Sequence, residues 1–209
     1  MFSGSFEAFS LRSLSAALLA GVAIKLMDDY IDREVDEICG KYSFALTLEG
    51  ALVPYALLCA ALACALDSSL ASSLIIGSYI VGMLPDLDEV FPSGLNARLE
   101  SIVVGLFGVI LLGWRAILSS IVLMSGVQLI DDIVDYLHEG AIVGRNYAKA
   151  FGCLGTGAAA LASMMLGFIL DSGKTITVMA AFLVLTAGEQ VLVARLTRLK
   201  RRGWATRDS

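Results

Sequence analysis

Apolar residues fill long runs of this chain, and short polar stretches separate the runs. A helix needs about 20 residues to cross the ~30 Å hydrocarbon core of a membrane, and most of the runs approach or exceed that length. We find no strict alternation of apolar and polar residues of the kind that indicates a half-buried strand. The pattern predicts an all-α, polytopic transmembrane bundle of about seven helices, over about 11–31, 43–66, 69–85, 95–113, 116–136, 150–170 and 175–195.

The composition supports a membrane protein. The chain has 209 residues, of which 57% are hydrophobic and 17% are charged, and its mean hydropathy is +0.80. Soluble domains contain about 45–50% apolar and about 25% charged residues. The length suits one integral-membrane domain over residues 1–209, and we expect the first apolar segment to be kept, because it lacks the features of a signal peptide. The four cysteines form no C-x-x-C pair, which argues against a disulfide or zinc framework.

The region 95–136 is compatible with one long helix or with two helices joined by a turn near Gly113. Lys and Arg gather on the cytoplasmic side of membrane proteins, so basic residues distinguish the two alternatives. With two helices, every segment rich in Lys and Arg falls on one side, together with both acidic motifs and the C-terminus. We therefore predict two crossings and a cytoplasmic position for these segments. They are the loop with Arg33 and Lys41, the loop with Arg145 and Lys149, and the tail with Arg195, Arg198, Lys200, Arg201, Arg202 and Arg207.

A short acidic phrase occurs twice, each time at the end of an apolar helix pattern. The two copies lie 103 residues apart, from 28 to 131 and from 36 to 139. In each copy three carboxylates follow one another at i, i+4 and i+8, which places them near one face of a helix. The repetition suggests a pseudo-repeat within the bundle. The two phrases contain Asp28, Asp29, Asp32 and Asp36, and Asp131, Asp132, Asp135 and Glu139.

Clustered carboxylates at a membrane boundary are unfavourable unless something neutralises them. Mg²⁺ prefers hard oxygen ligands and is usually held by one or two carboxylates together with substrate phosphates. Histidine and cysteine do not occur at a ligand spacing beside the acids, which argues against zinc. The sequence therefore predicts a magnesium and diphosphate site, with metal ligands drawn from Asp28, Asp29, Asp32, Asp36, Asp131, Asp132, Asp135 and Glu139.

The paired motifs resemble those of the UbiA superfamily of intramembrane prenyltransferases. The first phrase is similar to the family's N-D-x-x-D-x-x-x-D motif, with Asp28 in place of the usual Asn. The second is similar to D-x-x-x-D-x-x-x-D, with Glu139 in place of the last Asp. The family separates its motifs by four helices, and so does the order of helices predicted for this chain. The family's Y-x-x-x-K motif has no clear counterpart here, and one helix is missing at each end.

The resemblance implies Mg²⁺-dependent transfer of an isoprenoid chain from an allylic prenyl diphosphate to a lipophilic or aromatic acceptor, with release of pyrophosphate. It implies catalytic roles for Asp28, Asp32, Asp131 and Asp135. Cationic side chains should help to hold the diphosphate, and the candidates are Lys25, Lys41, Arg145 and Lys149. For Lys25 the alternative is an ion pair with a neighbouring aspartate, and Glu189 would either pair with Lys25 or line the cavity.

Other functions stay open. A membrane terpene cyclase of the same family would use the same site without an external acceptor. A cation-coupled transporter would use the repeated acidic helices, and it would normally need helices broken in both halves. Pro54 and Pro85 are not placed symmetrically, which favours the enzyme over the transporter. We expect the basic tail to bind anionic lipid rather than nucleic acid, and we leave open a degenerate structural homologue and a homo-oligomer.

Overall fold

The computed structural model describes residues 10–39, 43–91, 93–138 and 146–205. Within them the chain is helical, and its only extended pairing is an isolated bridge between Val90 and Asn96. The all-α prediction is confirmed, and each predicted range coincides with helix to within a few residues. The elements are α1 (Leu11–Ile31), α2 (Arg33–Cys39), α3 (Phe44–Leu48), the 3₁₀ turn η1 (Glu49–Ala51), α4 (Leu52–Leu66), α5 (Ser68–Met83), η2 (Leu84–Asp86), α6 (Ala97–Leu112), α7 (Trp114–His138), α8 (Tyr147–Leu170) and α9 (Ser172–Ala205).

Four of the described helical segments are long and apolar enough to cross a membrane. They are Phe44–Leu66, Trp114–Leu137, Tyr147–Leu170 and Ser172–Leu192. Many large apolar side chains on these helices are exposed at the surface of the bundle, as expected for contact with lipid. The length and apolar composition of these helices indicate an integral membrane protein. The helix Ser68–Met83 is apolar but shorter, so a count of seven crossings stays a prediction.

The break predicted near Gly113 is present. Helix α6 ends at Leu112 and α7 begins at Trp114, and the single residue between them has a φ of 87°. Glycine adopts that left-handed conformation without steric cost, and other residues do so rarely. Because α6 and α7 also pack against each other, the region 95–136 forms two helices rather than one.

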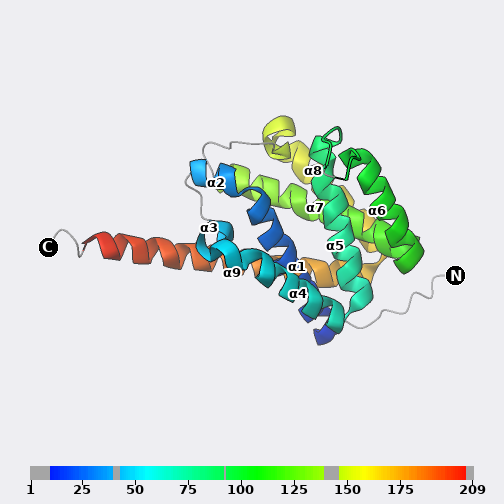
Figure 1. Ribbon diagram of the computed structural model, residues 1–209, viewed down its shortest axis with the longest axis horizontal. Helices are drawn as coiled ribbons and strands as arrows, with labels where there is room; N and C mark the ends of the chain where they lie inside the picture. Colours follow the sequence, from blue (N-terminus) through cyan, green and yellow to red (C-terminus); the bar gives the residue numbers. More distant parts are fainter. Residues whose placement is uncertain (1–9, 40–42, 92, 139–145, 206–209) are drawn as a thin grey trace.

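Helices α1 and α7, which carry the acidic motifs, end on the same side of the molecule (Figure 1). That side also holds α2, α3 and the C-terminal part of α9. At the opposite end, single residues join consecutive helices. Asp67 caps the N-terminus of α5, and Asp171 caps that of α9 in the same way. The side chain of Arg12, at the start of α1, donates to the carbonyl of Leu66 at the same end.

Small residues form the central core. The buried cluster contains alanines from α1, α4, α5 and α9, together with Leu74, Leu123 and Val178. Small side chains let helix backbones approach closely, which favours helix association inside membranes. Gly77 on α5 is the tightest case between two backbones, because a Cβ there would lie 2.9 Å from the backbone carbon of Ser120 on α7.

The same arrangement of helices occurs twice. We call α1, α3, α4 and α5 the first half and α7, α8 and α9 the second half. The first helix of each half packs against the next long helix, α1 against α4 and α7 against α8. The first helix of each half also packs against the last helix of the other half, α1 against α9 and α7 against α5. Helix α6 connects the halves and has no counterpart after α9 among the described residues.

Each half also contains one backbone break at the same position. Glu49 has a φ of 47° between α3 and α4, and Gly152 has a φ of 76° inside α8. The two residues stand 103 apart, which is the interval between the acidic motifs. The interval read from the motifs thus extends over the following helices.

A buried lysine holds three helices together at the end remote from the motifs. Lys174 on α9 is 8% exposed, and its Nζ donates to Ser73 Oγ at 2.9 Å and to the carbonyl of Ala116 at 2.8 Å. The hydroxyls of Ser119 and Ser120 lie 3.2 and 2.5 Å from the same nitrogen. The ammonium group therefore links α9 to both α5 and α7.

We expect Lys174→Ala to lower the free energy of unfolding by about 1–3 kcal/mol, because buried oxygens lose a charged donor. The measurement is thermal unfolding of the purified protein in detergent. Arg98→Ala is the control, since its ion pair with Asp88 at 3.2 Å is exposed and such pairs contribute about 0–1 kcal/mol. Equal unfolding temperatures for the two variants would contradict a linking role for Lys174.

Candidate active site at the two acidic motifs

The first motif spans the junction of two helices. Helix α1 ends at Ile31, and Asp32 is its C-cap. The backbone N–H of Asp32 donates to the carbonyl of Asp28, and that of Asp36 donates to Asp32, at 3.0 and 2.9 Å. The i→i−4 pattern therefore continues through the motif, and the three carboxylates follow at one-turn intervals as predicted. Asp28 and Asp32 are exposed, whereas Asp36 is half-buried.

The second motif lies on an unbroken stretch of helix. Asp131 and Asp135 are one turn apart near the end of α7, and both are half-buried. The third acid of this motif, Glu139, lies outside the described residues. Lys41 and Arg145, which were predicted to bind the diphosphate, also lie outside them. Lys149 is described and exposed on α8.

The structure brings the first acids of the two motifs together. The charge of Asp131 acts on Asp28 and Lys25 of α1 and on Glu189 of α9. Interactions between charges weaken with distance and with screening by water and salt, so their mutual influence indicates that these groups lie near one another. Residues 103 apart in the sequence therefore share one electrostatic environment, at the place where α1, α7 and α9 meet.

Lys25 sits in this group of acids. Its Nζ lies 3.7 Å from Asp29 Oδ1, one turn along α1, and 3.6 Å from Glu189 Oε1 on α9. Of the alternatives weighed for Lys25 and Glu189, the structure shows an ion pair between them. The pair joins the first half to the last helix of the second half. Whether Lys25 also holds a diphosphate stays a prediction.

The second aspartate of each motif accepts a backbone hydrogen bond from the next helix. Asp29 Oδ2 accepts from the N–H of Phe44 at 2.7 Å, and Asp132 Oδ2 accepts from the N–H of Tyr147 at 2.8 Å. Both amides belong to the first residue of a helix, α3 or α8, where N–H groups lack partners within the helix. The same bond, with the same oxygen, thus closes the loop after each motif. Asp29 is 8% exposed, so a metal ligand at this position would have to share its carboxylate with this bond.

Helix caps complete these closures and were not foreseen from the sequence. Ser43 caps α3, since its hydroxyl accepts from the N–H of Ala45. Asn146 caps α8 by accepting from the N–H of Lys149 at 2.9 Å, and its amide donates to the carbonyl of Asp132 at 2.8 Å. The motif interval of 103 residues relates Ser43 to Asn146, and that interval was the signal that could have revealed them.

The donors present fit a hard divalent cation in chemistry but not as a preformed cage. Within the part of the chain that the structure describes, histidine, cysteine and acidic side chains do not gather in a group of three or more that could hold a metal ion. Carboxylate oxygens are the ligands that Mg²⁺ prefers, and it is commonly held by one or two carboxylates together with waters and phosphate oxygens.

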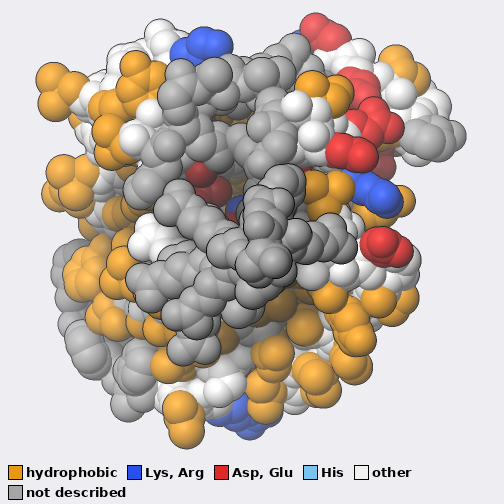
Figure 2. Space-filling model, turned by 90° about the vertical axis from the view of Figure 1, so that its left-hand side faces the viewer, with side chains coloured by type: hydrophobic (Ala, Val, Ile, Leu, Met, Phe, Trp, Pro, Cys, Tyr) orange, Lys and Arg blue, Asp and Glu red, His pale blue; other side chains and the backbone are white. Residues whose placement is uncertain are grey.

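Acidic side chains gather on the face of the molecule where the motif helices end (Figure 2). Acidic side chains that gather on one face attract cations to it.

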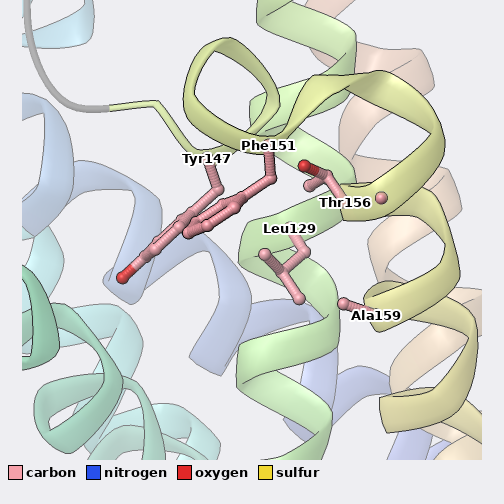
Figure 3. Close-up of a pocket in the computed structure, with 6 residues that line it drawn as sticks. Leu129, Tyr147, Phe151, Thr156 and Ala159 are labelled. Atoms are coloured by element: carbon pink, nitrogen blue, oxygen red, sulfur yellow. The ribbon is translucent and has the colours of Figure 1, made fainter.

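An apolar pocket of about 450 Å³ adjoins the second motif. It lies between α7 and α8 (Figure 3), and Leu129 in its wall precedes Asp131 by two residues. A smaller pocket of about 140 Å³, lined in part by Ser125 and Gln128, shares Leu129 and Tyr147 with it. Apolar volume therefore exists on the side of α7 that faces α8, where Asp132 holds the backbone N–H of Tyr147. The larger pocket is lined by Leu129, Tyr147, Phe151, Gly155, Thr156 and Ala159.

Substitutions at Asp29 and Asp132 test the loop closures. We expect Asp132→Ala to lower the free energy of unfolding by about 1–3 kcal/mol, because the Tyr147 N–H loses its acceptor. Asp132→Asn keeps a carbonyl oxygen and should retain most of the stability, and the same contrast should hold at Asp29. Thermal unfolding in detergent is the measurement. Equal losses for the Asn and Ala variants would show that the carboxylate acts through its charge instead.

Comparison with protein-family models, with curated proteins and with solved structures finds no match. The resemblance to the prenyltransferases accordingly stands on the two motifs and the order of helices. What the site does is inferred below from the residues of this chain.

Proposed function

We propose that the protein is a magnesium-dependent intramembrane prenyltransferase. It would transfer an isoprenoid chain from an allylic prenyl diphosphate to a lipophilic acceptor and release pyrophosphate. The observation that carries the proposal is the approach of the two acidic motifs, in which Asp131 of α7 acts on Asp28 and Lys25 of α1. A lone acidic turn would be an ordinary solvated helix end, whereas two that meet form a site for a polyphosphate and its cation.

In this proposal the carboxylates of the two motifs approach one metal–diphosphate unit from two helices. Asp28 and Asp32 would supply oxygens from the first half, and Asp131 and Asp135 from the second. Bound magnesium supplies positive charge that stabilises the departing pyrophosphate. Lys25, held near Asp29 and Glu189, would add a donor for phosphate oxygens.

The surroundings of the site suit a carbocation reaction. Allylic diphosphates ionise as the leaving group departs, and water would capture the resulting cation. Apolar helices exclude water from such a site and strengthen the electrostatic interactions inside it. The pocket of about 450 Å³ between α7 and α8 has an apolar lining, and its wall includes Tyr147, which Asp132 of the second motif holds. The same features would serve a terpene cyclase, in which the isoprenoid attacks its own cation.

One observation favours the transporter as a second candidate. The sequence argued against it because the prolines are not placed symmetrically, yet the helices are broken symmetrically, at Glu49 and Gly152. Broken helices at equivalent places in two halves are typical of ion sites in transporters. Both breaks, however, lie near the ends of their helices, next to the loops that Asp29 and Asp132 close, and not at the middle of the spans.

Alanine substitution tests the enzyme. We expect Asp32→Ala and Asp135→Ala each to abolish Mg²⁺-dependent pyrophosphate release from geranylgeranyl diphosphate, because each removes a carboxylate from one of the two motifs. Asp88→Ala is the matched control, since Asp88 is an exposed acid remote from the motifs in sequence and should leave turnover unchanged. Wild-type turnover in both motif variants would refute the assignment of the site.

Reconstitution in liposomes separates the two candidates. The enzyme should release pyrophosphate without any ion gradient and without moving sodium or protons across the bilayer. A transporter should show gradient-driven uptake that Asp32→Ala and Asp135→Ala abolish, with no pyrophosphate released. Mass analysis of the organic products would then distinguish transfer to an acceptor from cyclisation.

A further inference from the structure

The pocket between α7 and α8 has a closed counterpart in the first half. Each of its six lining residues stands 103 positions after a residue of a packed cluster formed by α1, α3 and α4. That cluster consists of Leu26, Ala45, Leu52 and Ala56, with Val22, Phe44, Leu48 and Val53 packed against it. The equivalent pairs are Leu26 and Leu129, Phe44 and Tyr147, Leu48 and Phe151, Leu52 and Gly155, Val53 and Thr156, and Ala56 and Ala159.

The change from leucine to glycine accounts for the open space. Leu52 is fully buried and fills the centre of the first-half cluster. Gly155 stands at the equivalent place, and a Cβ added there would meet only the Cβ of Phe151, at an ordinary 3.7 Å. The glycine is therefore not required by close packing of helices. Its effect is to leave a volume that the first half fills with a side chain.

The change from valine to threonine puts a hydroxyl at this volume. Thr156 is 2% exposed, and its Oγ1 is buried without a hydrogen-bond partner in the described part of the chain. A helical threonine usually donates to the carbonyl four residues earlier. That residue is Gly152, where the helix is broken. In Figure 3 the hydroxyl points toward Phe151, on the pocket side of α8.

A buried hydroxyl with no partner is unfavourable, and isosteric valine would avoid the cost. Its presence beside an apolar cavity is therefore the second observation that points to a ligand. Such cavities typically bind molecules with a largely apolar body through a few placed polar groups, in volumes of about 300–1,000 Å³. The pocket, at about 450 Å³, lies within that range.

We propose that this pocket binds an uncharged, lipophilic molecule that carries a hydroxyl or carbonyl group, with Thr156 as its hydrogen-bond partner. None of the six lining residues is charged, so a diphosphate does not belong here. A plain isoprenoid tail is a poor occupant too, because it offers nothing to the threonine. The assignment of this molecule as the acceptor rests on the proposed function, whereas its binding does not.

The aromatic wall indicates how the ligand enters. The rings of Tyr147 and Phe151 stack with an interplanar angle of 13° and centroids 6.3 Å apart. Phe151 is 72% exposed, so this wall faces the surroundings of the bundle. A lipophilic molecule dissolved in the bilayer reaches the pocket sideways past Phe151. The Oδ2 of Asp132 fixes Tyr147 through its backbone N–H, which places the pocket at the end of the second motif.

Photolabelling with a matched pair of probes tests the proposal. The purified full-length protein in detergent is irradiated with one of two aryl trifluoromethyldiazirines, which carry no carbonyl group: the hydroxyl probe has a 4-hydroxymethyl substituent, and the methyl probe has a 4-methyl substituent instead. Peptide mapping should place the label on Leu129 or within 147–159, with several-fold more label from the hydroxyl probe. The equivalent first-half segment, 44–56, should remain unlabelled because its cluster is closed.

Three variants sharpen the result. Gly155→Leu copies the first half and should reduce labelling of 147–159 several-fold. Thr156→Val is near-isosteric and should keep labelling by the methyl probe while removing the preference for the hydroxyl probe. Gly188→Leu is the matched control, because the same substitution on α9 enters open space and should change nothing. Circular dichroism establishes that each variant is folded.

Unchanged labelling of 147–159 in Gly155→Leu, or an equal preference in wild type and Thr156→Val, would overturn the proposal. Labelling needs neither magnesium nor diphosphate, so it is separable from the proposed chemistry. Pocket labelling without pyrophosphate release would keep the binding site and refute the prenyltransferase. Pyrophosphate release with no label in the pocket would refute the binding site and keep the prenyltransferase.

Discussion

Repulsion among carboxylates governs the organisation of this protein. Asp28, Asp131 and Glu189 come together where three helices meet, and Lys25 is the described cation among them. Like charges in a poorly hydrated place raise the energy of the fold unless cations or hydrogen bonds compensate. The positive charge of Lys25 offsets part of this repulsion. The backbone N–H groups of Phe44 and Tyr147 stabilise the adjacent carboxylates of Asp29 and Asp132. Repulsion that these groups leave uncompensated would favour a bound cation, and the proposed chemistry depends on such a cation.

The two aspartates at the start of each motif divide two tasks between them. Asp29 and Asp132 turn toward the next helix and hold its first amide. Asp28 instead feels the charge of Asp131. A doubled aspartate is therefore needed at each place, since neighbouring residues on a helix point in directions about 100° apart.

The positions of the helices could be predicted from the sequence because they depend on local pattern. Apolar runs gave the positions of the helices, and the distribution of Lys and Arg predicted the break that Gly113 makes. The hydrogen bonds of Asp29 and Asp132 could not be predicted, because both partners are backbone N–H groups, which every residue except proline carries. The pocket at Gly155 could not be predicted either, since an empty volume depends on what two packed helices leave unfilled. Only the comparison of the two halves makes that glycine informative.

Helix α6 determines the end of the bundle at which the second half begins. Each half contains three long helices, so it finishes at the end of the bundle opposite to the one where it begins. If the halves were joined directly, the second half would begin at that opposite end and would be inverted. Helix α6 adds one more pass between Met83 and Trp114, and the second half then begins at the end where the first began. Asp28 and Asp131 consequently reach the same side. Insertion or deletion of one long helix between the halves would place the carboxylates at opposite ends of the bundle without altering a single residue of either motif.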